Sequence, residues 1–130
     1  MATGRTQNAA EDDAAEPGEP PPDIETMRAT AHRALALAAP PTATDVTLLI
    51  EQLRGQVELM VTEVEPLAAQ HAATMTGALA TVCVGEGRRK LAAGADIRPL
   101  ASARLAYARR LARVLFALCD HHRNLSGADS

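Results

Sequence analysis

Apolar residues recur every three or four positions through most of the chain after residue 22, and this periodicity predicts amphipathic helices. The clearest stripe lies between residues 42 and 65, and its members are Val46, Leu49, Ile50, Leu53, Val57, Met60 and Val64. Alternating steps of three and four are typical of a helix that packs along its neighbours at a shallow angle. We expect Pro66 to break or kink this helix, because proline removes a backbone hydrogen bond and clashes with the preceding turn.

Three further segments show the same periodicity. Residues 24–38 follow Asp23, a favourable N-cap, and end before Pro40. Residues 68–93 form the next predicted helix, with core contacts from Met75, Leu79, Val82, Cys83 and Leu91. Residues 99–123 form the last one, with a stripe made of Leu100, Tyr107, Leu111, Val114, Leu115, Leu118 and His122. No strand alternation is present, so the pattern predicts an all-α fold, an antiparallel four-helix bundle.

The two ends of the chain differ from this helical domain, residues 23–125. Residues 1–22 are acidic and proline-rich, and they hold too little apolar surface to offset the entropy of ordering. We therefore expect a disordered N-terminal tail there. Residues 126–130 are expected to be a frayed, disordered C-terminus.

The composition favours a cytoplasmic protein with an aliphatic core. Hydrophobic residues make up 47 % of the chain, but Tyr107 and Phe116 are its only aromatic side chains. Residues 1–22 contain no apolar signal segment, and no stretch approaches the roughly 18 apolar residues of a membrane span. Cys83 and Cys119 lie in apolar surroundings, where cysteine usually acts as a small buried hydrophobe. No cofactor is predicted.

The charge is distributed unevenly. Residues 1–65 carry twelve acids and four bases, whereas residues 66–130 carry nine bases and four acids. One cluster is a candidate patch for an anion or a partner, and its members are Arg88, Arg89, Lys90, Arg109, Arg110 and Arg113. Nucleic acid is disfavoured, because the chain has a net charge of −3, lacks stacking aromatics and contains no helix-turn-helix pattern. The cluster is otherwise expected to be solvated, or to pair with acids such as Glu58, Glu63 and Glu65, and Glu86 is the candidate partner of Arg104.

Gly85 to Lys90 combine two glycines with three basic residues, which invites a phosphate-binding interpretation. Neither the Walker spacing nor a strand before the glycines is present. We favour close helix packing instead, because Gly77, Thr81 and Gly85 recur every four residues.

Cys119, Asp120, His121 and His122 resemble metal ligands by residue type. Only Cys119 and His122 have the spacing that places two ligands on one helical face. If the last two helices form a hairpin, His71 lies at the same height, so His71, Cys119 and His122 are the candidate metal ligands. The favoured interpretation is structural, with no metal bound.

Several segments resemble a family of small actinobacterial helical proteins. The resemblance covers nearly all of residues 23–125 and is carried by stretches such as Val82–Leu91 (VCVGEGRRKL) and Ala108–Leu125 (ARRLARVLFALCDHHRNL). Its most specific pieces are Cys83–Glu86 with the basic run after it, and Arg109–Arg113 leading to Leu118–His121. The family is a domain of unknown function described in connection with natural-product biosynthesis. The resemblance therefore implies a setting in secondary metabolism, and it supplies no catalytic residues.

No catalytic arrangement converges in the sequence. It has no Ser-His-Asp order, no paired carboxylates on one face and no Cys-His pair with an orienting group. The preferred hypothesis is a small accessory or interaction protein that uses a helical groove or a homodimer face, and enzymatic activity is disfavoured. The alternatives are a small-molecule or metal-binding module, and a DNA-associated regulator that uses the arginine face.

Overall fold

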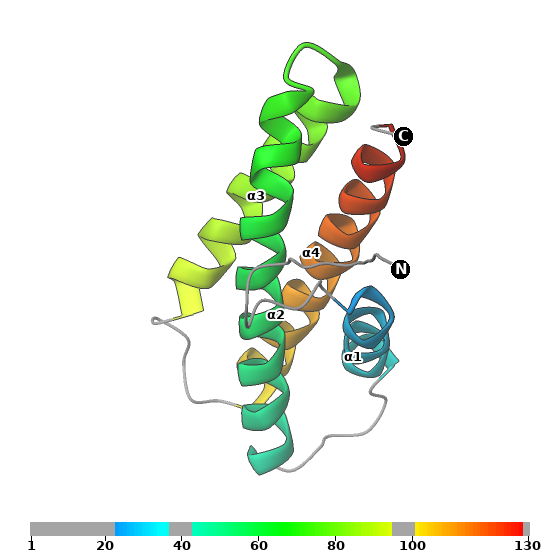
Figure 1. Cartoon of the computed structure of the whole chain (residues 1–130). Coiled ribbons are helices and arrows are strands. Elements are labelled where there is room, and N and C mark those ends of the chain that lie inside the picture. The colour runs from blue at the N-terminus through cyan, green and yellow to red at the C-terminus, as the bar shows by residue number, and fades with distance from the viewer. Residues whose placement is uncertain (1–22, 37–42, 95–100, 129–130) are drawn as a thin grey trace, which may run out of the picture.

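The computed structural model describes residues 23–36, 43–94 and 101–128 (Figure 1). These ranges contain four α-helices and no strand: α1 (Ile24–Ala36), α2 (Ala43–Gln70), α3 (Met75–Ala93) and α4 (Ala101–Ala128). The all-α four-helix bundle expected from the periodicity is confirmed for these ranges. The expected N-terminal tail, residues 1–22, lies outside the described residues, as do residues 37–42 and 95–100.

The helices form an antiparallel bundle around a central pair. α2 and α4 lie against each other over most of their length, and α1 and α3 flank this pair on opposite sides (Figure 1). Each flanking helix contacts both central helices, and consecutive helices run in opposite directions. This arrangement leaves α3 with an outer face that no other described helix covers.

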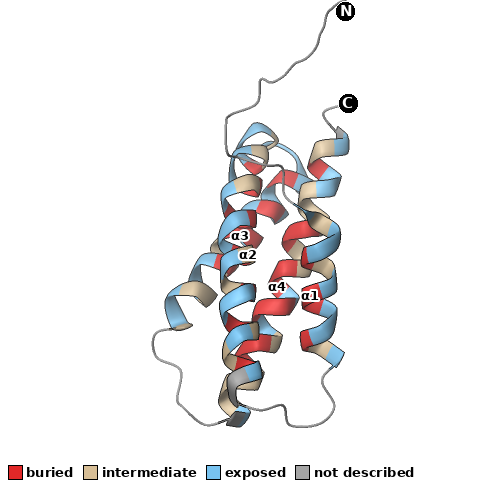
Figure 2. Cartoon of the chain, turned by 60° about the horizontal axis from the view of Figure 1, so that its bottom comes forward, coloured by how far each residue is buried: buried red, intermediate tan, exposed pale blue. Residues whose placement is uncertain are grey.

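The core is centred on α2 and α4, takes buried residues from all four helices (Figure 2) and is almost entirely aliphatic. Most members of the apolar stripes predicted for these two helices are buried, whereas Leu49 and His122 are only partly buried and Leu100 lies outside the described residues. The least exposed large members are Leu53, Val57, Met60, Val64, Tyr107, Leu111, Leu115 and Leu118. Their burial supplies the main driving force for folding, since each fully buried aliphatic side chain contributes about 1.5–3 kcal/mol.

The turn between α2 and α3 lies later than the sequence suggested. α2 continues through Pro66 to Gln70, and Pro66 is exposed, so the missing backbone hydrogen bond falls on the solvent side. The packing of Leu67 and Ala68 on the core holds this last turn in place. A break at Pro66 and a start of the next helix at residue 68 were therefore wrong, while the alternative of a kink at Pro66 stays a prediction. α3 begins at Met75, where the Thr74 hydroxyl caps the helix by accepting the Gly77 N–H at 3.0 Å.

The C-terminal helix is longer than predicted. α4 continues to Ala128, past the predicted end at Arg123, so residues 126–128 are helical and not frayed. Leu125 is only 1 % exposed and anchors this last turn to the core. The expected helix start at Pro99 lies outside the described residues.

Side chains from two other helices fix the C-terminal end of α3. Arg54 of α2 donates from Nη1 to the Leu91 carbonyl at 2.9 Å and to the Tyr107 hydroxyl at 2.6 Å. Tyr107 of α4 in turn donates its hydroxyl to the Lys90 carbonyl at 2.8 Å. The last carbonyls of a helix lack a full set of partners within the helix, and these bonds give two of them side-chain donors; the Leu91 carbonyl also accepts the Gly94 N–H. They hold α3 at a fixed height relative to α4.

Candidate functional site

α3 packs on the bundle through its smallest residues and turns its larger apolar residues outward. Its buried positions are Gly77, Ala80, Cys83, Val84 and Gly87, which recur at steps of three and four. The larger side chains of Met75, Leu79 and Val82 are 73 %, 52 % and 64 % exposed. They had been predicted as core contacts, and that prediction was wrong for all three. Cys83 and the partly buried Leu91 do contact the core as predicted.

The small residues explain this rotation of α3. A Cβ atom at Gly87 would lie 2.9 Å from the Val61 Cγ2 atom of α2, so glycine there permits a close approach of the two helices. The expected close-packing row of Gly77, Thr81 and Gly85 was only partly correct, because Thr81 is exposed. A stripe of small residues could have been recognised in the sequence, but the larger apolar residues dominate the periodicity.

The outward face of α3 borders a groove between α3 and α4 with a volume of about 520 Å³. Leu79, Val82 and Cys83 of α3 face Val114, Ala117 and His121 of α4 along its apolar part. Lys90 of α3 and Arg110 and Arg113 of α4 line its other end, together with Glu86. We call these two parts the apolar end and the basic end. Each wall covers eleven helical steps, which corresponds to a length of about 16 Å.

The basic end carries net positive charge. Among the described residues, Glu86 is the one acid that lines the groove; it accepts a hydrogen bond from Lys90 Nζ at 2.9 Å and pairs with Arg89 at 3.5 Å. The Lys90 ammonium, through this hydrogen bond and its charge, holds the pKa of the Glu86 carboxyl below its ordinary value, so Glu86 is ionised at neutral pH. Arg110 and Arg113 are exposed and form no ion pair or hydrogen bond with any other described residue. Two guanidinium groups therefore remain available at the rim.

Two further side chains that could take part in chemistry line the groove, His121 and Cys83. The His121 Nδ1 atom is buried and has no hydrogen-bond partner among the described residues. Burial, reinforced by the charge of Glu86, raises the pKa of the Cys83 thiol from its ordinary value of 9.0 to about 11. Cys83 is therefore a protonated, unreactive thiol at neutral pH, and neither it nor Cys119 forms a disulfide.

This pKa predicts slow alkylation of Cys83. At pH 8 a thiol with a pKa of about 11 is about 0.1 % thiolate, so we expect iodoacetamide to modify Cys83 about 100-fold more slowly than an ordinary exposed cysteine. The rate should rise about tenfold for each pH unit between pH 7 and 9. Peptide mapping by mass spectrometry follows Cys83 separately from Cys119, and the urea-unfolded chain serves as the fast-reacting control. A rate that reaches a plateau near pH 8 would contradict the raised pKa.

The raised pKa of Cys83 also determines whether the fold gains or loses stability as the pH rises. The folded-state pKa of Cys83 lies above the unfolded value, so the buried thiol contributes stability that is fully present below about pH 9. This contribution is lost as the pH rises from about 9 toward 11.

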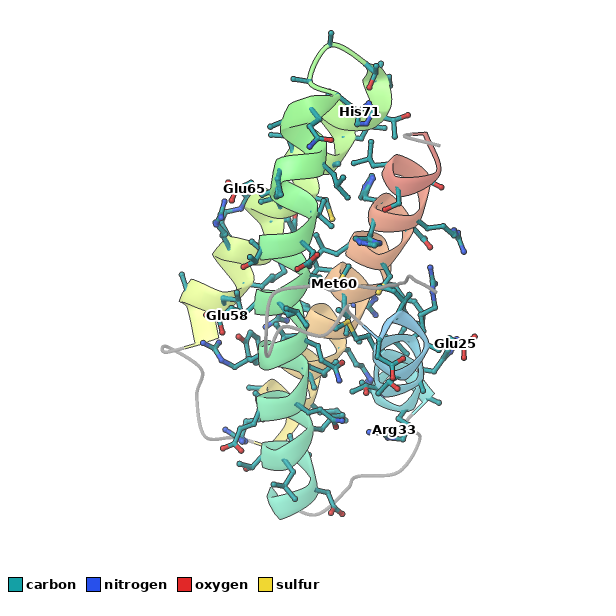
Figure 3. All side chains as sticks on the ribbon, in the orientation of Figure 1. Glu25, Arg33, Glu58, Met60, Glu65 and His71 are labelled. Carbon is teal, nitrogen blue, oxygen red and sulfur yellow. The ribbon has the colours of Figure 1, made fainter. Side chains whose placement is uncertain are left out.

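The candidate metal ligands do not converge. His71 lies beside the turn between α2 and α3, as Figure 3 shows, whereas Cys119 is fully buried in the core. Asp120 binds Arg28 of α1 at 2.6 Å, while its neighbour His121 faces the groove on the other side of α4. Within the described ranges, no three His, Cys, Asp or Glu side chains form a group that could hold a metal ion.

The candidate basic patch is divided between several faces. Arg88 forms two hydrogen bonds with Glu65 of α2, at 2.9 and 2.7 Å, which matches the expected pairing with this acid. Arg109 lies on the face of α4 that also carries Phe116 and Asp120, and Phe116 and Asp120 contact His32 and Arg28 of α1. Lys90, Arg110 and Arg113 are the members that meet at the groove.

Arg104 does not pair with Glu86. It donates instead from Nη2 to the Thr47 hydroxyl at 2.7 Å, while Glu86 pairs with Lys90 one turn along its own helix. The expected Arg104–Glu86 pair was therefore wrong. The sequence could not reveal this, because the height of α4 relative to α2 decides which acceptor Arg104 meets.

The comparisons with known proteins give one match. A family model described as a family of unknown function, DUF6415, matches residues 25–127. No curated protein and no solved structure is significantly similar to the chain. The matched range spans all four helices and therefore includes both walls of the groove. No helix in the described part of the chain is long and apolar enough to cross a membrane.

Proposed function

The chain belongs to the family of unknown function DUF6415, and we propose that it works as a helical accessory protein that binds a partner protein. The occupant of the α3–α4 groove is an amphipathic helix that carries acidic residues. The proposal rests on one observation: Leu79 and Val82 are exposed along the apolar end of a groove whose basic end carries two arginines without an acidic partner among the described residues. Contiguous exposed apolar side chains rimmed by charge are typical of protein interaction sites.

The shape of the groove fits a helix. Its length of about 16 Å corresponds to three helical turns, so it can accept apolar anchors at positions i, i+4 and i+7 of a bound helix. Leu79, Val82 and Ala117 offer apolar contacts to such anchors, and Arg110 and Arg113 offer hydrogen bonds to carboxylates. Charge complementarity at the rim favours an acidic partner over a basic one and speeds its association.

A second copy of the chain fits the groove less well than an acidic partner. Arg110 and Arg113 need carboxylates, and Glu86, the acid that lines the groove, is already bound to Lys90 and Arg89. If two copies of the chain associated through this groove, the guanidinium groups of each copy would be buried without carboxylate acceptors from the other copy, which is costly. We accordingly propose a different protein as the occupant.

The cellular setting follows from the resemblance to actinobacterial proteins linked with natural-product biosynthesis. We propose that the protein is cytoplasmic and acts within a biosynthetic or regulatory complex. Its role there is to hold another protein and not to catalyse a reaction.

Binding of a designed peptide tests the proposed function. The probe is a fluorescein-labelled helix of 18 residues with leucines at i, i+3, i+4 and i+7 and glutamates elsewhere. We expect Leu79→Glu to weaken its binding at least tenfold in a fluorescence anisotropy titration, because the new carboxylate removes an apolar contact and repels the probe.

Leu48→Glu provides the matched control. Leu48 is 59 % exposed, comparable to Leu79, but it lies on α2 outside the groove, so its substitution should leave the affinity unchanged. A second peptide with lysines in place of glutamates should bind at least tenfold more weakly. Equal losses in the two variants, equal binding of the two peptides, or no saturable binding at all would overturn the proposal.

A further inference from the structure

We infer that the acidic N-terminal segment of the same chain, residues 11–16, competes with the partner for the basic end of the groove. This inference rests on the proposed function, because it assigns a regulator to the same site. The segment has the sequence EDDAAE and holds four carboxylates without a single base. Its targets are Arg110 and Arg113, the two groove cations that no described acid neutralises.

The segment can reach this position. Arg28 binds Asp120 at 2.6 Å, and α1 runs antiparallel to α4, so the chain enters α1 at Asp23 near the C-terminal turns of α4. A path from Asp23 around α4 and down to Arg113 measures about 25 Å, given the diameter and rise of a helix. Asp13 lies ten residues before Asp23, and ten residues can span up to about 33 Å.

The chemistry of the segment determines how it acts. It contains no large apolar residue, so it has nothing to place on Leu79 and Val82 and can occupy only the basic end. A tethered segment has an effective concentration in the millimolar range, which is enough for weak ion pairs to form. The segment thus shields the two arginines and lowers the affinity for acidic partners, and an apolar helix with enough carboxylates displaces it. Salt weakens this competition, because the ion pairs are exposed.

A spin label detects the contact without any partner. In the full chain with A15C, a nitroxide is directed to the new cysteine, because both native thiols are buried. We expect the amide NMR signals of Arg110 and Arg113 to broaden. The broadening should disappear when D12K and D13K are added to the same chain, and also in 1 M salt. Unbroadened signals at low salt would overturn the inference.

The designed acidic peptide then tests the competition. We expect D12K/D13K to strengthen peptide binding at least threefold, whereas E51K/E58K changes the net charge equally at exposed positions of α2 and should have a clearly smaller effect. Equal effects of the two double variants would refute the competition while leaving the proposed function in place. Failure of the peptide to bind any variant would refute the proposed function, and the label would still report whether the segment contacts the groove.

Discussion

Replacing Gly77 by alanine is expected to lower the free energy of unfolding by about 3 kcal/mol, at the upper end of the usual cost of overpacking. A Cβ atom at this position would collide with the backbone carbonyl oxygen of His71. That carbonyl cannot move freely, because it accepts the Thr74 N–H at 2.9 Å and the Thr74 hydroxyl at 2.8 Å. The substitution therefore forces the turn between α2 and α3 apart and removes the cap of α3. Urea denaturation followed by circular dichroism measures the loss.

Gly55→Ala is the control, with an effect of the opposite sign. Gly55 lies inside α2, and an added Cβ atom would meet no atom within 4 Å. Alanine stabilises a helix interior by about 0.5–1 kcal/mol relative to glycine, so this variant should be more stable than the wild-type chain. If the two substitutions had similar effects, the described geometry of the turn would be incorrect.

The periodicity of α2 and α4 was sufficient to predict where the core lies. α2 and α4 are the two longest helices of the described ranges, and each contacts the other three helices. Their broad apolar stripes can therefore be buried only at the centre of the bundle. Leu53, Met60 and Leu111 are fully buried as a result. In such helices the apolar stripe seen in the sequence is also the buried face, so the sequence alone predicts which side of the helix faces the core.

α3 could not be oriented in the same way. It carries two competing faces, one of small residues such as Ala80 and Gly87 and one of large residues such as Leu79 and Val82. Periodicity favours the larger residues, but the bundle uses the smaller ones, because they let α3 lie close to α2 and α4. The exposure of Met75, Leu79 and Val82 follows from this choice. The choice depends on packing across three helices, which no local pattern encodes.

The residues that line the candidate groove were predicted only in part, because the sequence does not determine the orientation of α3. The sequence singled out Arg110 and Arg113 together with four other basic residues, but it could not show which of them share a face. The orientation of α3 places Arg88 beside Glu65 on one side and Lys90 at the groove on the other. Charge alone thus identified a set of basic residues, and the tertiary structure separates Arg88, which pairs with Glu65, from Arg110 and Arg113, which line the groove.

The position of α3 against α4 depends on Tyr107, and its removal should have the largest effect on stability in the bundle. Tyr107 is 1 % exposed and joins the Arg54 side chain to the Lys90 carbonyl. We expect Tyr107→Ala to lower the free energy of unfolding by about 3–5 kcal/mol, because it creates a large cavity and leaves buried polar groups without partners. Urea denaturation measures this loss directly.

Tyr107→Phe separates the hydroxyl group from the ring. It keeps the packing but removes both hydrogen bonds, so the expected loss is about 1–2 kcal/mol. Because the Lys90 carbonyl loses its donor, the end of α3 should open more often, and the Gly94 amide, which donates to Leu91, should exchange faster with solvent. The same loosening should weaken binding of the acidic peptide, since Lys90 lines the basic end of the groove. If Tyr107→Phe exchanged and bound like the wild-type chain, these hydrogen bonds would not position the groove, and packing alone would hold α3 against α4.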